Sequence, residues 1–146
     1  MQGAHRHLLD ALVAPPQGHQ VQVGGVGHSP LAVVGMAGQL GHARGLDGKR
    51  VALLVTQGSR WVEAFLGIVL ADAVAVPLSP LHPEPEQAWF VDASHASAIV
   101  VSDEMADRVR GFAGSRPVLR IEALREHAAT CELADTKPDD VGCILY

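Results

Sequence analysis

The side chains that could carry chemistry in this sequence are histidines, paired carboxylates, and serines that follow apolar runs. Eight histidines invite a metal site, but only His5 and His7 are close together, and no set of Cys and His has zinc spacing. The spacing therefore favours solvent-facing histidines, and we assign no metal-binding residue. The full set is His5, His7, His19, His28, His42, His82, His95 and His127.

Two acidic pairs and two serines are the remaining candidates for acid–base or nucleophilic work. Asp103-Glu104 and Asp139-Asp140 neighbour a predicted helix start or a loop, where acidic residues stabilise the helix dipole without an acid–base role. Ser59 and Ser79 each follow a strand-like run, but neither lies in G-x-S-x-G. We expect Ser59 to cap a helix and Ser79 to form a turn. No catalytic residue is assigned.

The segment Gly24 to Gly27 is the glycine cluster that could cradle a phosphate. A nucleotide fingerprint needs a long preceding strand or a following Lys-Ser/Thr, and this segment has neither. A flexible turn is the favoured interpretation, with phosphate contact as the alternative. No cofactor-binding residue is therefore assigned.

Composition limits the class of protein. The chain has 146 residues, 48% hydrophobic and 18% charged, which excludes a disordered chain. The net charge is −5, and the 11 Lys and Arg are scattered, which argues against binding to nucleic acid or to an anionic membrane surface. No apolar stretch reaches the roughly 20 residues of a membrane span. The apolar core of the N-terminal segment is too short for a secretory signal. We expect a cytoplasmic protein in which Cys131 and Cys143 are reduced thiols.

The elements that position these residues are organised around Arg50 to Pro80. Val51–Val55 and Ala73–Leu78 are apolar runs typical of strands buried on both faces. Between them, Arg60–Ala71 has apolar residues at three- and four-residue steps, including Trp61, which predicts a helix. Strand, helix and strand with short connections predict a right-handed βαβ unit. Trp61 and Trp89 are expected to be packing residues.

The rest of the chain continues this alternation, so we predict an α/β fold with a mainly parallel sheet and flanking helices. Residues 29–146 are expected to form this α/β subdomain, and residues 1–28 an N-terminal helix and flexible lead-in. Further strands are predicted at Gln20–Val23, Ala98–Val101, Val118–Ile121 and the final Val141–Tyr146, and further helices at Arg6–Val13, from Pro30 to Gly45, and at Pro85–Asp92, Asp103–Phe112 and Glu122–Ala129.

Four segments in order resemble the N-terminal region of the adenylate-forming (AMP-dependent) acyl-CoA synthetase/ligase family. They are GKRVALL (Gly48–Leu54), ADAVAVPLSP (Ala71–Pro80), DASHASAIVV (Asp92–Val101) and the final DDVGCILY, which is similar to the strand that leads into the family's phosphate loop. The resemblance covers Ser29 to Tyr146. Asp72 replaces a glycine that is usual in the family, which we expect to be tolerated if its carboxylate reaches solvent.

This resemblance implies an incomplete N-terminal subdomain of an adenylate-forming enzyme. The full enzyme would use ATP and magnesium to convert a carboxylic acid to an acyl-adenylate and pyrophosphate, and would then transfer the acyl group to CoA. Family members place the phosphate loop, the acyl pocket and a catalytic lysine beyond the position of Tyr146. The resemblance therefore implies a fragment that binds no cofactor and is inactive alone. The LSPLHPEPE turn is similar to the malonyl-CoA or short- and medium-chain branch.

The alternative is a non-catalytic α/β binding or interaction module derived from that family. In either case Ile144, Leu145 and Tyr146 would form an apolar strand with few covering residues. We expect this strand to be buried by the remainder of the synthetase or by self-association, and expect neither a nucleic-acid partner nor a membrane span.

Overall fold

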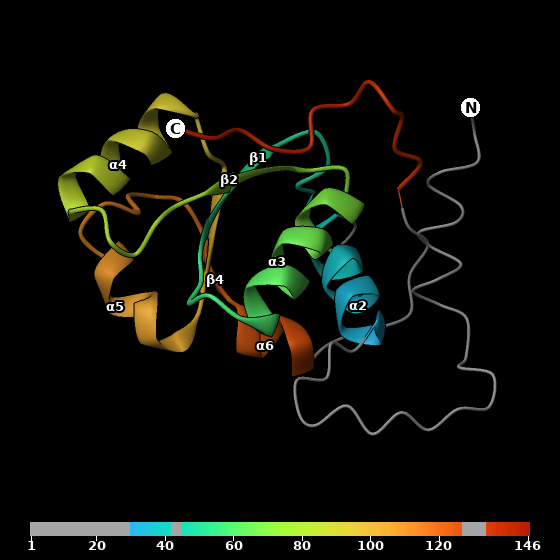
Figure 1. The fold of residues 1–146 in the computed structure, drawn as a ribbon, viewed down its shortest axis with the longest axis horizontal. Helices are drawn as coiled ribbons and strands as arrows, with labels where there is room; N and C mark the ends of the chain where they lie inside the picture. The colour runs from blue at the N-terminus through green and yellow to red at the C-terminus, as the bar shows by residue number, and fades with distance from the viewer. Residues whose placement is uncertain (1–29, 42–44, 127–133) are drawn as a thin grey trace.

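Four parallel strands form one sheet with helices on both faces in the computed structural model, which describes residues 30–41, 45–126 and 134–146 (Figure 1). The strand order is β2-β1-β3-β4, and every neighbouring pair is parallel. The predicted α/β class is confirmed, and the four predicted strands of the central and following region occur within a residue or so of their expected bounds. The strands are β1 Arg50–Leu54, β2 Val74–Pro77, β3 Ala98–Val101 and β4 Val118–Arg120.

Strand β1 is buried on both faces, which explains its continuous apolar run. Val51 and Leu53 point into one hydrophobic cluster, whereas Ala52 and Leu54 point into the other. All four side chains are fully inaccessible to solvent. Because side chains alternate along a strand, a five-residue run has to be apolar throughout to serve two cores.

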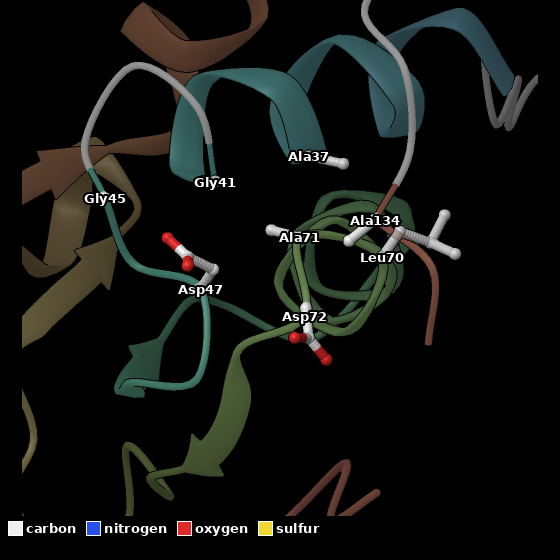
Figure 2. A pocket seen from close by; sticks show the side chains of 8 residues that line it. All are labelled: Ala37, Gly41, Gly45, Asp47, Leu70, Ala71, Asp72 and Ala134. Carbon is white, nitrogen blue, oxygen red and sulfur yellow. The ribbon is translucent and has the colours of Figure 1, made fainter. Parts of the chain in front are cut away.

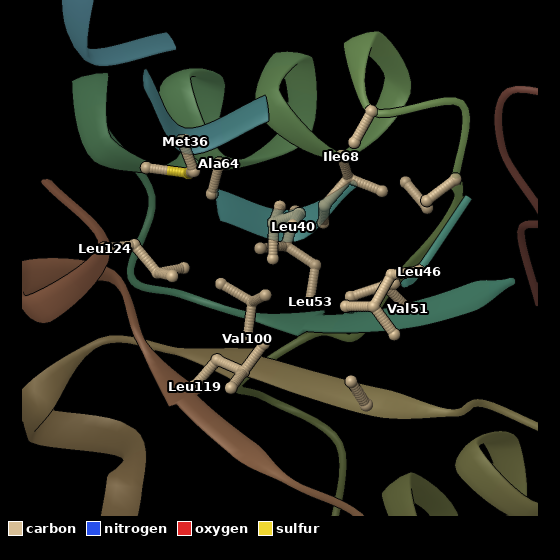
Figure 3. Close-up of a cluster of buried hydrophobic side chains, with 14 of the residues drawn as sticks. Met36, Leu40, Leu46, Val51, Leu53, Ala64, Ile68, Val100, Leu119 and Leu124 are labelled. Atoms are coloured by element: carbon tan, nitrogen blue, oxygen red, sulfur yellow. The ribbon is translucent and has the colours of Figure 1, made fainter. Parts of the chain in front are cut away.

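The first face of the sheet is covered by α2 (Pro30–Leu40), α3 (Ser59–Leu70) and α6 (Ile121–Glu126). Figure 3 shows Met36 of α2 beside Ala64 of α3, and Leu40 of α2 beside Ile68 of α3 above Leu53. A methyl group added at Gly67 would come within 3.0 Å of Met36, so α2 and α3 approach closely at this glycine. Helix α2 begins at Pro30, the predicted first position.

The second face is covered by α4 (Glu84–Ala93) and by a short α5 (Ala106–Val109), which bury Val91 and Val109 against the sheet. The single helix predicted over Asp103–Phe112 is wrong. A 3₁₀ turn, η1 (Asp103–Met105), precedes α5, and the helix stops before Gly111. Glycine is a poor helix former, and two glycines lie at 111 and 114, so the chain turns instead of continuing.

The C-terminal segment lies at the outer edge of the sheet, beside β2. It makes one parallel bridge, Cys143 with Ala75, through hydrogen bonds from Ala75 N to Gly142 O (2.9 Å) and from Ile144 N to Ala75 O (2.8 Å). The predicted strand Val141–Tyr146 is therefore reduced to a single bridge. Ile144 packs against the second core, but Leu145 and Tyr146 are exposed, as expected.

Several predicted elements lie outside the described residues: the helix at 6–13, the strand at 20–23 and the last three residues of the helix at 122–129. In the described ranges, the helices are too short or too polar to cross a membrane.

Two ion pairs join α3 to α6. In the first pair the cation lies on α3, and in the second pair it lies on α6. Arg60 Nη1 lies 2.6 Å from Glu122 Oε1, and one turn later Arg125 Nε lies 3.1 Å from Glu63 Oε2. Glu63 is only 1% exposed, and neither of its carboxylate oxygens accepts a hydrogen bond from the described residues. The Arg125 charge is therefore the main compensation for burying this carboxylate.

We expect Arg125→Met to lower the free energy of unfolding by about 2–4 kcal/mol, because it leaves the Glu63 carboxylate buried without a cation. The double variant Glu63→Met/Arg125→Met should recover most of that loss, since two apolar side chains replace the pair. Urea denaturation measures both. If the single and double variants are equally destabilised, the cost comes from lost packing and not from an unpaired charge.

Helices α3 and α4 both end in a Schellman motif without glycine. After α3, Asp72 has φ 58°, its N–H bonds to Val69 O (3.1 Å), and Ala73 N–H bonds to Ile68 O (3.1 Å). After α4, His95 has φ 53° in the same role. This left-handed position at a helix end usually carries glycine, so Asp72 and His95 adopt a backbone conformation that other residues rarely take.

Replacing Asp72 by glycine should raise the free energy of unfolding by about 0.5 kcal/mol. Glycine relieves about 1 kcal/mol of left-handed backbone strain in the folded protein. This gain exceeds the stability that is lost because glycine gives the unfolded chain more conformational entropy. The matched variant Asp72→Ala should instead lower stability, because alanine tolerates this conformation less well than aspartate. Thermal unfolding of the two variants beside the parent is the measurement, and a glycine variant less stable than the alanine variant would contradict it.

Candidate functional site

The chain changes direction across the sheet between β1 and β3. After β1 it adds β2 on one side, and after α4 it returns to add β3 on the other side. In open parallel sheets such a switch leaves a crevice at the carboxyl ends of the two strands, where ligands commonly bind. The carboxyl edge of β1 and β3 is therefore the candidate site.

Three polar side chains meet at this edge, directly after the two apolar strands. The Thr56 hydroxyl donates to Glu104 Oε1 over 2.7 Å. Ser102, which is 1% exposed, lies beside it, with its Oγ 3.4 Å from both Thr56 N and Thr56 Oγ1. We call these three residues the Thr56 cluster. It connects the end of β1 to the end of β3.

The pKa of Glu104 lies below its ordinary value. The largest cause is the hydrogen bond that the Thr56 hydroxyl donates to this carboxylate, and a hydrogen bond from the backbone N–H of Glu104 and the nearby charge of Arg60 act in the same direction. A carboxylate with a lowered pKa is a weak base. Glu104 is therefore better suited to binding a cation or a hydrogen-bond donor than to removing a proton.

The arginines that border this edge are already paired. Arg60 contacts Glu122 at 2.6 Å, and Arg120 Nε lies 2.8 Å from Asp103 Oδ1. A triphosphate needs several free donors or cations, and these two arginines would first have to leave their carboxylates. In this structure neither arginine can contact a triphosphate without first breaking its ion pair.

The two serines have different outcomes. Ser79 Oγ accepts the N–H of Leu81 (3.2 Å), which confirms its predicted turn. The cap predicted for Ser59 is wrong, because Ser59 is the first residue of α3 and Gly58 stands at the cap position with φ 146°. Glycine adopts that backbone angle easily, so the helix starts one residue earlier than the serine would require.

The acidic pairs lie where the sequence predicts, but Glu104 has a partner that the local pattern does not reveal. Asp103 and Glu104 stand in η1, and Asp140 accepts the N–H of Lys137 (2.6 Å) in the predicted loop. Thr56 and Ser102 were not singled out by sequence reasoning. The sequence could have identified them, because each is a hydroxyl residue at or just beyond the end of a predicted buried strand.

Only two of the eight histidines belong to the described residues. His95 is exposed as predicted, whereas His82 is half-buried with its ring 5.3 Å from that of Phe90, so the solvent-facing prediction is wrong for His82. Within the described ranges no three His, Cys, Asp or Glu side chains gather as metal ligands. His5, His7, His19, His28, His42 and His127 lie outside those ranges, as do Gly24 to Gly27 and Cys131.

The structure also tests the predictions for the two tryptophans and for Cys143. Trp61 stacks on Phe65 with ring centroids 5.2 Å apart and packs on the first core, as predicted. Trp89 is 59% exposed and is therefore not a core residue, but its ring lies 5.6 Å from that of Tyr146 in the C-terminal segment, which fits the predicted packing between elements. Cys143 is half-buried and free, and burial raises the pKa of its thiol, which keeps it protonated at neutral pH.

A pocket of about 360 Å³ opens at the opposite edge, before the amino ends of β1 and β2 (Figure 2). Asp47 and Asp72 contribute its charged side chains, and small residues such as Ala37 and Gly41 line the rest. None of the described lining residues is a cation. A nucleotide phosphate would meet two carboxylates there, so the pocket does not fit one.

We expect Thr56→Val to raise the pKa of Glu104 toward its ordinary value, because the variant removes the hydroxyl donor. A lowered folded-state pKa stabilises the protein above the unfolded-state pKa, and this stability disappears as the pH falls through the folded-state pKa. The variant should therefore lose less stability on acidification than the parent. NMR titration of the Glu104 carboxyl carbon measures the pKa directly.

The control is Thr56→Ser, which keeps the hydroxyl and should keep the lowered pKa. An unchanged Glu104 titration in Thr56→Val would show that Thr56 does not cause the shift.

The known proteins named below are much longer than this chain. A CoA ligase from Gibberella moniliformis is 39% identical over 57 residues, which are 39% of this chain and 10% of that protein. A long-chain-fatty-acid–AMP ligase from Mycolicibacterium smegmatis is 33% identical over 103 residues, 64% of this chain and 16% of that protein. The chain spans between 1% and 16% of the lengths of the curated relatives that it matches.

The fold is also found in solved structures. MatB from Rhodopseudomonas palustris superposes with a TM-score of 0.70 at 22% identity, over 81% of this chain and 26% of that one. Residues 32–146, most of the chain, match the family of AMP-binding enzymes. By this match, the chain belongs to the AMP-binding enzyme family of adenylate-forming ligases.

Proposed function

We propose that this chain is the N-terminal part of an AMP-forming acyl-CoA synthetase. The observation that carries the proposal is the match of residues 32–146 to the AMP-binding enzymes, and the likeness to a CoA ligase supports CoA as the acceptor. In the proposed reaction a carboxylate attacks the α-phosphorus of ATP and pyrophosphate leaves. The CoA sulfur then attacks the acyl carbon, and AMP leaves with the bonding electrons.

In this proposal the chain supplies a scaffold, and residues beyond it bind ATP, magnesium and CoA. The pairing of Arg60 and Arg120 with carboxylates supports this division. We propose residues 29–146 as the α/β subdomain, residues 1–28 as its lead-in, and the cytoplasm as the site of an enzyme that uses ATP and CoA. The branch proposed from the Leu78–Glu86 turn is one that activates malonate or another short or medium acid.

The alternative function is a non-catalytic binding or interaction module. It is favoured by the exposed apolar side chains of the edge segment, Val141 (62%), Leu145 (77%) and Tyr146 (50%). Either the remainder of the synthetase or a second copy of the chain would cover this segment. The DNA after the Tyr146 codon distinguishes the two: a Thr-Ser-Gly-rich continuation supports the synthetase, and a stop codon with a stable product supports the module.

The isolated chain should release no pyrophosphate from ATP in the presence of malonate, short-chain or medium-chain acids, magnesium and CoA. The physical reason is that, in this proposal, the groups that hold ATP and stabilise the charge on the transferring phosphoryl group are supplied by residues other than those of this chain. A full-length CoA ligase assayed in parallel shows that the assay detects turnover. Pyrophosphate release above background that depends on both ATP and the acid would contradict the proposal.

A further inference from the structure

We draw no further inference here: the strongest candidate, the pocket of about 360 Å³ before the amino ends of β1 and β2, carries nothing because its charged side chains, Asp47 and Asp72, are an acidic pair with no second observation among the described residues that points to a ligand.

Discussion

Because β1 bonds to a parallel strand on each side and is buried on both faces, the remaining elements are required to cover it. Its side chains supply both hydrophobic clusters at once, Val51 and Leu53 on one side and Ala52 and Leu54 on the other. A parallel sheet of this kind is stable only with helices on both faces. The crossover through α3 covers the first face and the crossover through α4 covers the second, so two consecutive βαβ units complete the two outer layers.

The same strand decides where polar chemistry can occur. Along β1 after Arg50, and along all of β3, every side chain is buried, so the polar groups of this edge appear where these strands end. There Thr56 forms hydrogen bonds to both Ser102 and Glu104, and the adjacent arginines pair with Glu122 and Asp103. Groups that satisfy each other in this way stabilise the edge. They leave little free charge for a phosphate, which is why we propose that the reactive groups of the synthetase come from elsewhere in a longer chain.

The comparisons agree with a scaffold that several ligases share. The chain is 39% identical to a CoA ligase over 57 residues and 33% identical to a long-chain-fatty-acid–AMP ligase over 103 residues. Packing of a buried parallel sheet imposes much the same apolar pattern whatever acid is activated.

Local sequence patterns alone determined the four main strands, the starts of α2 and α4 near proline and the α/β class. These features depend on apolar runs and apolar periodicity over a few consecutive residues, and such local patterns do not depend on the rest of the fold. Local patterns also misled at two places: Ser59 is not the cap of α3, and the segment 103–112 is not one helix. Only the tertiary structure decided the left-handed ends at Asp72 and His95, the burial of Glu63 beneath Arg125, and the bond between Thr56 and Glu104. Each of these depends on which strands and helices become neighbours in space, and that order is set by packing of the whole sheet.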